Sequence, residues 1–460
     1  MTATMSSQTP EDTSPALPSL AEATLTWARI GLLSFGGPAG QIALMHRIVV
    51  EEKRWVGEER FLHALNYCML LPGPEAQQLA VYLGWLMHRT LGGLIAGLLF
   101  VLPGALVMLG LSAIYAVYSD MPVLNAVFFG IKAAVVGIVL QALLRIARRS
   151  LKNGVMIALA ACAFVAIYIF NVPFPLIILA AGVFGWVGSR VWPDIFSLSG
   201  KKGAQTAGPP GLVDLMHARG ELAHTEPSAG RVVRTLLIWI PLWLGPVLLL
   251  WLLMPATVWS QIAVFFTTMS VVTFGGAYAV LSYVAQAAVQ TYGWVSPQEM
   301  IDGLGLAETT PGPLILVLQF IGFLAAFRAP GALDPVVAGI VGSLVTLWVT
   351  FAPCFFWIFL GAPYMEKLRG HAAASAAMTA ITAAVVGVIA NLALWFALHV
   401  VFRETFRIGE IGPMLPVPDS MDWRAVLLVA LGMVLLFRFN AGVLTVLGIS
   451  AFGGLLFSMF

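Results

Sequence analysis

The sequence is poor in charged residues. Of its 460 residues only 10% are Asp, Glu, Lys or Arg, whereas 60% are hydrophobic; soluble domains average about 25% charged residues. A chain with so few charges cannot cover a water-exposed surface, which excludes an ordinary soluble protein. Its net charge of +2 and its lack of a basic tract give no indication of a nucleic-acid partner.

Cysteine and the common catalytic motifs are also scarce. The three cysteines lie in or beside apolar segments without metal-like spacing, so the sequence offers no disulfide framework. HExxH, GxSxG and the P-loop pattern GxxxxGK[ST] do not occur. The first 20 residues contain no Lys, no Arg and no apolar core, so we expect no secretory signal peptide. We predict neither an enzyme nor a bound cofactor.

Long apolar segments are abundant. Runs of about 20 apolar residues, the length that a helix needs to cross a bilayer core, recur from end to end and do not alternate as in a membrane β-barrel. We predict an all-α polytopic integral membrane protein with about 10 to 13 membrane segments. The predicted helices are 22–50, 60–88, 91–118, 122–149, 151–170, 172–192, 232–254, 257–289, 299–327, 331–360, 370–400, 423–438 and 441–459.

Two parts of the sequence repeat each other. The stretches "SFGGPAGQIALMHRIVVEEKRW" (34–55) and "TFGGAYAVLSYVAQAAVQTYGW" (273–294) share a Phe-Gly-Gly motif and a terminal Trp. A Pro-Gly-Pro motif follows each of them, at 72–74 and at 311–313, and all these matches are 239 residues apart. Further on, "AAVVG" occurs twice at a spacing of 250 residues. We interpret the chain as two homologous repeats.

One long polar segment, rich in Gly, Pro and charge, separates the repeats. Positive loops stay in the cytoplasm, so its cations indicate a cytoplasmic linker; they are Lys201, Lys202, Arg219 and Arg231. The predicted organisation is a disordered tail (1–21), the first repeat (22–192), the linker (193–231), and an extra helix plus the second repeat (232–460).

Charge also indicates that the two repeats have opposite orientations. The loop after the predicted helix 122–149 is strongly basic, and the turn before that helix holds Asp120 and no cation. The corresponding turn of the second repeat holds Lys367 and Arg369 instead. This reversal is expected for inverted-topology repeats. Counting segments leaves one loop on the wrong side of the membrane unless a broken segment is re-entrant.

Glycine and proline interrupt the apolar segments at the same places in both repeats. Because lipid cannot hydrogen-bond to the backbone, such breaks must be buried in protein or face water. The prolines end one helix and suit the first position of the next. A half-helix that starts there offers free N–H groups and a positive dipole end, which favour an anion. An alternative is that Gly-Gly only permits close helix packing and that Pro only kinks the helix.

Paired interrupted helices in two halves are typical of a transporter's central site. We therefore predict one substrate site, built at the breaks from both repeats. The first repeat supplies Gly36, Gly37, Pro38, Gln41, Gly73, Pro74, Glu75, Gln77 and Gln78. The second repeat supplies Gly275, Gly276, Glu308, Thr309, Thr310, Gly312 and Pro313. No catalytic residue and no metal ligand is predicted.

Three charged residues within the apolar segments extend this prediction. A cation inside a membrane helix is costly and marks function by default, so Lys132 is included in the substrate site; pairing with Glu75 or snorkelling to an interface are the alternatives. The charge of Glu75 would repel an anion. One hypothesis is that Glu75 or Glu308 takes up a proton when the anion binds, and helix capping is the alternative for Glu75.

One further pair of polar residues occupies corresponding positions in the repeats. Gln141 and Asn391 are 250 residues apart. We expect both to act as hydrogen-bond partners between helices rather than as ligands.

The motifs "SFGGPAGQIALM", "EEKRWV", "LLPGPEAQQLAVYLGW" and "FVLPGA" resemble the signature of the chromate ion transporter family, in particular its long-chain bacterial members with two homologous halves. The resemblance covers roughly residues 22–192 and 257–400. It implies a multi-pass carrier of the bacterial inner membrane that exports chromate and confers chromate resistance. Its partners would be chromate and the lipid bilayer, with a homodimer as one form of assembly.

The second repeat departs from this signature. Ala277 replaces Pro38, Leu314 replaces Glu75, and the "EEKR" charges are absent, so we expect the halves to contribute unequally. Without a P-loop, the energy would come from the membrane potential or a proton gradient. The alternatives are a carrier of sulfate or a related tetrahedral oxyanion, a channel, and an intramembrane enzyme. Chromate reduction would need a redox cofactor, for which the sequence has no fingerprint.

Overall fold

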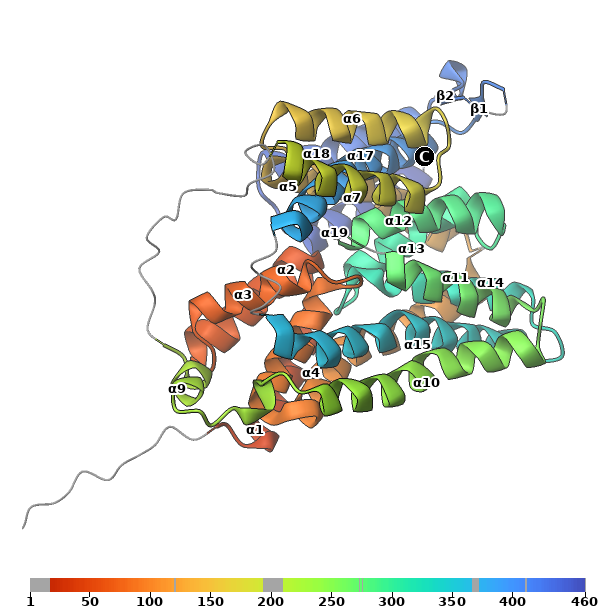
Figure 1. Ribbon diagram of the computed structural model, residues 1–460. Coiled ribbons are helices and arrows are strands. Elements are labelled where there is room, and N and C mark those ends of the chain that lie inside the picture. Colours follow the sequence, from red (N-terminus) through yellow and green to blue (C-terminus); the bar gives the residue numbers. More distant parts are fainter. Residues whose placement is uncertain are drawn as a thin grey trace, which may run out of the picture.

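The computed structural model describes residues 17–119, 121–192, 210–272, 274, 276–365, 372–409 and 412–459. Several predictions therefore fall outside the described residues: those on the tail 1–16, the linker residues 193–209, Asp120, Gly275, Lys367 and Arg369. The rest of the chain is an assembly of packed helices with one small β-hairpin (Figure 1).

The helices of the first half follow the predicted apolar segments. They are α1 (Leu20–Leu33), α2 (Gly37–His46) with a π-helical turn (Arg47–Glu52), α3 (Glu58–Cys68), α4 (Glu75–Tyr118), α5 (Pro122–Ser150), α6 (Gly154–Tyr168) and α7 (Phe174–Val191). The linker region contributes α9 (Leu212–Ala218) and a 3₁₀ turn (Ala223–Thr225) before α10 (Ala229–Leu253).

The second half repeats much of this order. It consists of α11 (Val258–Val272), α12 (Ala277–Gln286) with a π-helical turn (Ala287–Thr291), α13 (Pro297–Thr309), a 3₁₀ turn (Leu314–Leu316), α14 (Val317–Arg328), α15 (Pro335–Gly361) with a 3₁₀ turn (Ala362–Tyr364), α17 (Ala372–Val401), α18 (Trp423–Phe437) and α19 (Val443–Ser458). Between α17 and α18, β1 (Thr405–Arg407) pairs antiparallel with β2 (Met414–Pro416), followed by a 3₁₀ turn (Pro418–Ser420). The sequence did not predict this hairpin.

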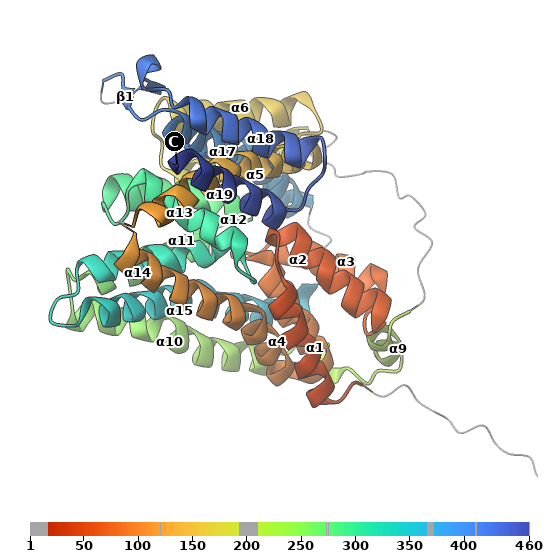
Figure 2. The same cartoon turned by 180° about the vertical axis from the view of Figure 1, so that it is seen from behind.

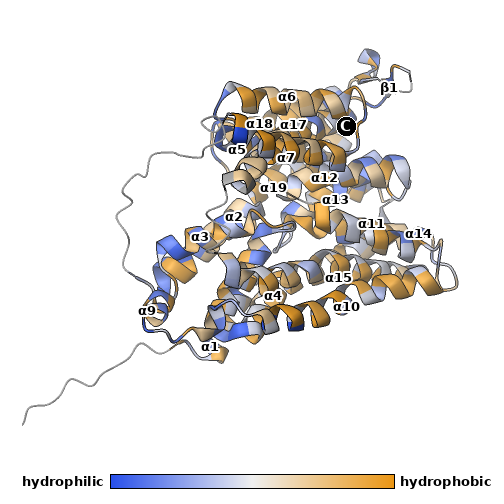
Figure 3. Ribbon diagram, viewed as in Figure 1, coloured by the Kyte–Doolittle hydropathy of each residue, from blue (hydrophilic) through white to orange (hydrophobic). Residues whose placement is uncertain are grey.

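The protein is an all-α polytopic membrane protein. Six of the described helices are long and apolar enough to cross a bilayer: α4, α5, α7, α10, α15 and α17. On α10, Leu237 is 70% exposed and Leu253 is 76% exposed, and apolar residues dominate the outer helices (Figure 3). Such surfaces are stable only against lipid, because exposing them to water would be unfavourable.

The predicted segments 22–50, 60–88, 257–289 and 299–327 are not single spans. Each is a helical hairpin in which the chain enters, turns at the Gly/Pro motif and returns. The four hairpins are α1–α2, α3 with the first part of α4, α11–α12, and α13–α14. The second hairpin ends where α4 leaves helical geometry at His88 and Arg89. The 14 residues of α1 span about 21 Å, less than the roughly 30 Å of a hydrocarbon core.

Contacts between the two arms prove the reversal. In the first hairpin Lys53 Nζ lies 2.8 Å from Glu22 Oε1, so the end of the hairpin lies beside its beginning. In the fourth hairpin Arg328, at the end of α14, forms an ion pair with Glu299, at the start of α13. Glycines with positive φ make the first reversal possible, with φ +84° at Gly36 and +71° at Gly37.

The described part of the predicted linker, residues 210–231, contains helix and packs against the first half. Its helix α9 docks on the loop that joins the first two hairpins, where Leu212 N–H donates to Arg54 O at 3.0 Å and the Arg60 side chain donates to Asp214 at 2.5 Å. We call this side of the molecule the α9 end. The β1–β2 hairpin marks the opposite end, as both views show (Figures 1 and 2).

The four hairpins enter from opposite ends. The first two start at the α9 end, because the loop between them contacts α9. The 25 residues of α10 then extend about 37 Å from α9 to the other end, where α11 begins. The third and fourth hairpins therefore start at the β1–β2 end, and the tips of all four point toward the middle of the protein (Figure 2).

Candidate functional site

The tip of the first hairpin binds the tip of the fourth. The Gly312 N–H, in the second Pro-Gly-Pro motif, donates to Ser34 O at 2.7 Å. The Gln41 side-chain amide, one turn into α2, donates to Gly312 O at 2.5 Å. The side chains of Ser34 and Gln41 are both buried. One residue of the second half, Gly312, is therefore held by two groups of the first half through its N–H and its carbonyl.

The tip of the third hairpin lies against the tips of the other three hairpins. The Tyr278 hydroxyl, in the first turn of α12, donates to Glu308 Oε1 of the fourth hairpin at 2.7 Å. The same hydroxyl lies 3.9 Å from the position that a Cβ on Gly37 would occupy. Glu75, at the start of α4, faces Gly276, where an added Cβ would lie 3.5 Å from Oε2. All four Gly/Pro breaks thus meet in one place.

Four helix starts gather at the meeting point, beside the ends of α1, α3, α11 and α13. The helices α2, α4 and α12 and the 3₁₀ turn before α14 all begin there, and none of these starts has a side-chain cap. Several carbonyl groups at the tips do have donors: Pro72 O accepts from Gln78 Nε2 at 2.7 Å, and Gly312 O accepts from Gln41. Uncapped N–H groups and positive dipole ends therefore remain, which favour an anion.

The prolines sit where helix starts require them. Pro38 is in the first turn of α2, and Pro74 and Pro313 immediately precede the helical turns that follow them. Since proline has no N–H and a fixed φ, it suits these positions. Gly73 has φ +118° and Gly312 has φ +89°, which glycine adopts without strain.

The polar side chains at the tips differ in how far they are satisfied. The Thr309 and Thr310 hydroxyls donate to Leu306 O and Ala307 O of their own helix, at 2.7 and 3.1 Å. In contrast, Gln77 is fully buried and neither atom of its amide has a partner among the described residues. Buried amides are normally hydrogen-bonded, so a ligand or water at the tips would satisfy Gln77.

Two acids and two arginines face this region. Glu308 is 3% exposed, whereas Glu75 is only partly buried. Arg145 and Arg149 stand in the last two turns of α5, and the Arg149 guanidinium lies 3.6 Å from the sulfur of Met69, near the first Pro-Gly-Pro motif.

Lys132 lies apart from the tips. Its Nζ is 3.5 Å from Asp302 Oδ1, and Tyr115 donates to Asp302 Oδ2 at 2.9 Å. Asp302 and Glu308 are six positions apart on α13, about 9 Å along the helix. Asp302, not Glu75, is thus the ion-pair partner of Lys132, because Glu75 faces Gly276 instead. The structure brings the other described predicted residues together at the tips and leaves Lys132 in a neighbouring buried pair.

Sequence reasoning missed two residues of this region, Tyr278 and Asp302. Asp302 is an acid within the predicted helix 299–327, and the rule that singled out Lys132 applies equally to it. Tyr278 follows the second Phe-Gly-Gly motif by two positions, where the first repeat has Ala39. Its hydroxyl was a signal, but only the fold places it against Glu308.

Comparison with known proteins gives the family. The profile of the chromate transporter family matches residues 21–186 and 260–455, which contain both pairs of Gly/Pro motifs. The chain belongs to the chromate transporter family. The two matched regions leave out α9 and α10.

Individual members of the chromate transporter family agree over most of their length. The chain is 30% identical to the chromate transport protein of Cupriavidus metallidurans over 82% of each chain. It is 29% identical to the probable chromate transport protein of Synechococcus elongatus, over 87% of this chain and 92% of that one. The chromate transport protein of Pseudomonas aeruginosa is 29% identical over 78% of this chain and 77% of that one. No solved structure matches.

Proposed function

We propose that this protein transports chromate across the bacterial inner membrane by a secondary active mechanism. The observation that carries the proposal is the meeting of four uncapped helix starts in the middle of a chromate transporter family member. Chromate is a tetrahedral oxyanion, and backbone N–H groups at helix starts bind such anions without needing a buried cation. The names of three relatives also support this substrate.

We further propose that the two halves are inverted-topology repeats that rock about the site. The first two hairpins enter from the α9 end and the last two from the β1–β2 end, with equivalent motifs at all tips. Inverted halves with interrupted helices at their interface support alternating access in other transporters. The re-entrant hairpins also explain why counting the predicted segments as spans left one loop on the wrong side.

We infer the orientation in the membrane from the distribution of cations, and the direction of transport is part of the proposal. The α9 end carries most of the described Lys and Arg residues, and the β1–β2 end carries few. The cations near the β1–β2 end are Arg328, Arg403, Arg407 and Arg424. Because positive loops remain in the cytoplasm, we place the α9 end inside the cell. Export from that side would lower cytoplasmic chromate and confer resistance.

Coupling to protons is assigned to the pair of Tyr278 and Glu308. Their hydrogen bond joins the third and fourth hairpins. No cation is within ion-pair distance of Glu308 among the described residues, and an unpaired buried carboxylate is costly. A proton taken up together with the anion would remove that cost. Because a proton that leaves the cell with the anion moves against an inward proton gradient, the energy for export would come from the membrane potential, which drives the remaining negative charge outward.

Uptake of labelled chromate into everted membrane vesicles tests the proposal. We expect energised uptake that excess sulfate reduces, because the two dianions have the same shape. Uptake of sulfate in preference to chromate would favour the alternative, a sulfate or related oxyanion carrier. No uptake of either anion by protein shown to be folded and inserted would refute an oxyanion carrier, and leak currents in a planar bilayer would indicate a channel.

A further inference from the structure

A second basic cavity lies outside the hairpin tips. At the α9 end, the last turns of α5 and the end of α18 border an open cavity of about 600 Å³, and its arginines are exposed. Its polar lining consists of Gln141, Arg145, Arg148, Arg149 and Asn440. We call it the arginine vestibule. None of its three arginines is in an ion pair with an acid of the described chain, so their charges are available to a ligand.

The arginine vestibule is connected to the hairpin tips. Arg145 lines the cavity from the last two turns of α5. Arg149 lines it too and lies 3.6 Å from the sulfur of Met69, three residues before the first Pro-Gly-Pro motif. An anion held by Arg149 would therefore lie near the Pro-Gly-Pro turn of the first half.

A corresponding cavity at the opposite end has a different character. It is lined by Asn391, Trp395 and Leu398 of α17, which stand 250 residues after Gln141, Arg145 and Arg148, and by Asn171 after α6. Asn171 and Asn440 both follow a short apolar helix by three residues and have φ of +51° and +49°. The two cavities therefore occupy equivalent places in the two halves.

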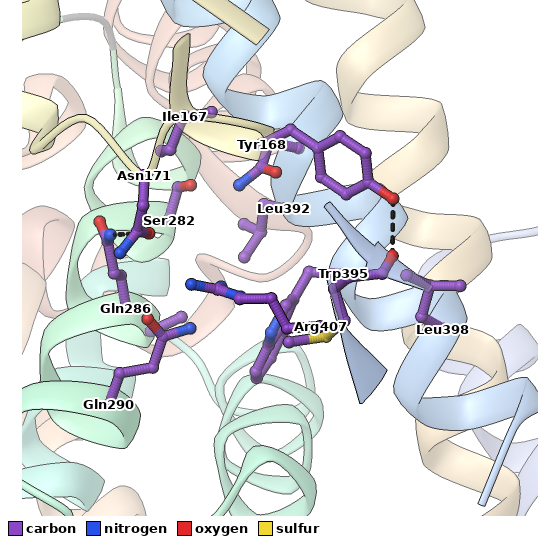
Figure 4. Close-up of a pocket in the computed structure, with 13 residues that line it drawn as sticks. Ile167, Tyr168, Asn171, Ser282, Gln286, Gln290, Leu392, Trp395, Leu398 and Arg407 are labelled. Atoms are coloured by element: carbon purple, nitrogen blue, oxygen red, sulfur yellow. Dashed lines mark hydrogen bonds between the residues drawn. The ribbon is translucent and has the colours of Figure 1, made fainter. Parts of the chain in front are cut away.

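This second cavity, which we call the amide pocket, is almost closed. Its volume of about 40 Å³ holds little more than a water molecule. Gln286 donates to Asn171 at 2.6 Å across it, and Tyr168 donates to Met414 O at 2.7 Å (Figure 4). Arg407 extends into it as its one lining cation. Two of the arginine positions are thus Trp and Leu here, so the basic cavity exists at one end only.

We propose that the arginine vestibule is an accessory binding site for a tetrahedral oxyanion of charge −2, on the side from which the substrate is captured. The proposal rests on the proposed function and adds a site to it. Guanidinium groups bind such oxyanions through two parallel hydrogen bonds, and a concentration of positive charge at a cavity mouth raises the local concentration of anions. The same chemistry fits the phosphate group of an anionic lipid, which basic pockets on the cytoplasmic side also hold.

Equilibrium binding of labelled chromate to the purified full chain tests this site without relying on transport. In nanodiscs of phosphatidylcholine, we expect Arg148→Gln to weaken binding about tenfold, since hydrogen bonds to charged groups contribute that much. Arg148→Lys should recover part of the loss. The matched control is Arg190→Gln: Arg190 lies at the same end, but its guanidinium stacks 3.9 Å from the ring centre of Trp186. That variant should bind like the wild type.

Nanodiscs that contain phosphatidylglycerol distinguish the two sources of oxyanion. If the lipid phosphate is the occupant, Arg148→Gln leaves chromate binding in phosphatidylcholine unchanged, and the wild type but not the variant retains phosphatidylglycerol through purification. Equal chromate binding and equal lipid retention by wild type and Arg148→Gln would overturn the proposal. The proposed function fails separately, as a wild type that binds the anion but does not transport it.

Discussion

The tips of the two halves have the same backbone turns but different side chains. Each half supplies one Phe-Gly-Gly turn and one Pro-Gly-Pro turn, and a helix starts after each without a cap. The acids occupy different places: Glu75 follows the Pro-Gly-Pro turn of the first half, where the second has Leu314, and Glu308 precedes that of the second half, where the first has Met69.

The difference separates two roles. What the halves share, the reversals and the free N–H groups, is suited to hold an anion and would be presented equally from both sides. The side chains that differ between the halves make specific contacts. Gln41 hydrogen-bonds to the tip of the fourth hairpin, and Tyr278 hydrogen-bonds to Glu308. The residue of the second half that corresponds to Gln41 is Val280, which has no amide. The second half therefore cannot make the equivalent hydrogen bond to the first.

The largest effect on stability is expected at the buried ion pair that joins the halves. Lys132→Met would leave Asp302 as a buried charge without its partner and should lower the free energy of unfolding by about 3–5 kcal/mol. The double variant Lys132→Met, Asp302→Asn should recover most of this loss. Thermal unfolding of the purified protein in detergent measures both.

The control for this pair is an exposed ion pair of the first hairpin. Arg29 and Glu52 have side chains 54% and 39% exposed, so Arg29→Gln should cost about 0–1 kcal/mol. Equal losses for the Arg29 and Lys132 variants would show that the buried pair has no special part in joining the halves.

The next largest effect is expected at the turn of the fourth hairpin. Gly312→Val places a branched side chain at φ +89° and disturbs the backbone N–H and carbonyl that Ser34 and Gln41 hold. Chromate uptake should fall roughly 100-fold, the effect of a displacement of about 1 Å in an active site. Gly110→Ala, on α4 with nothing within 4 Å of the added Cβ, should transport normally. Near-normal uptake by Gly312→Val would contradict a site at the tips.

The two acids should differ in how uptake depends on pH. If Glu308 takes up one proton with the anion, wild-type uptake falls by up to about tenfold per pH unit as the pH rises, and Glu308→Gln flattens this dependence. Glu75→Gln should keep it. The measurement uses a pH range in which the anion remains doubly charged. A flat pH profile for Glu75→Gln alone would show that Glu75, in the first half, takes up the proton. Unchanged profiles for both variants would show that neither acid does.

The smallest effect is expected at the hydrogen bond from Gln41 to Gly312 O. Gln41→Leu removes the hydrogen bond to Gly312 O and should destabilise the protein by about 1 kcal/mol, with a reduction in uptake. Gln290→Leu is the matched control, because Gln290 is exposed and outside the tips; its effect should stay within about 0.5 kcal/mol. A Gln41→Leu variant as stable as the control would show that this hydrogen bond contributes nothing to stability.

Much of this architecture could be predicted because it depends on local chemistry. Continuous apolar runs predicted the long helices, and the duplicated Gly/Pro motifs predicted where helices break. What local chemistry could not show is that the chain reverses at each break. A proline or glycine permits a kink and a turn equally, and the choice depends on what packs against the tip, such as Ser34 O against the Gly312 N–H.

The site divides in the same way. That the breaks carry helix starts could be predicted, because a helix start creates free N–H groups wherever it lies; the substrate site at these residues stays a prediction. The partners Tyr278 and Asp302 were missed, since each pair joins segments that lie apart in the sequence. Lys132 and Asp302 are 170 positions apart, as their numbers show; only packing determines which acid a buried cation meets.

The sequence by itself determined that this protein is helical, spans a membrane, contains a duplicated motif and has the signature of its family, because composition and local geometry act within a few residues. The tertiary structure alone decided that four hairpins meet at their tips, that Gln41 and Tyr278 link them, and that three arginines line a cavity at one end. These are contacts over long separations, and their free energy depends on the simultaneous burial and alignment of groups that no local pattern encodes.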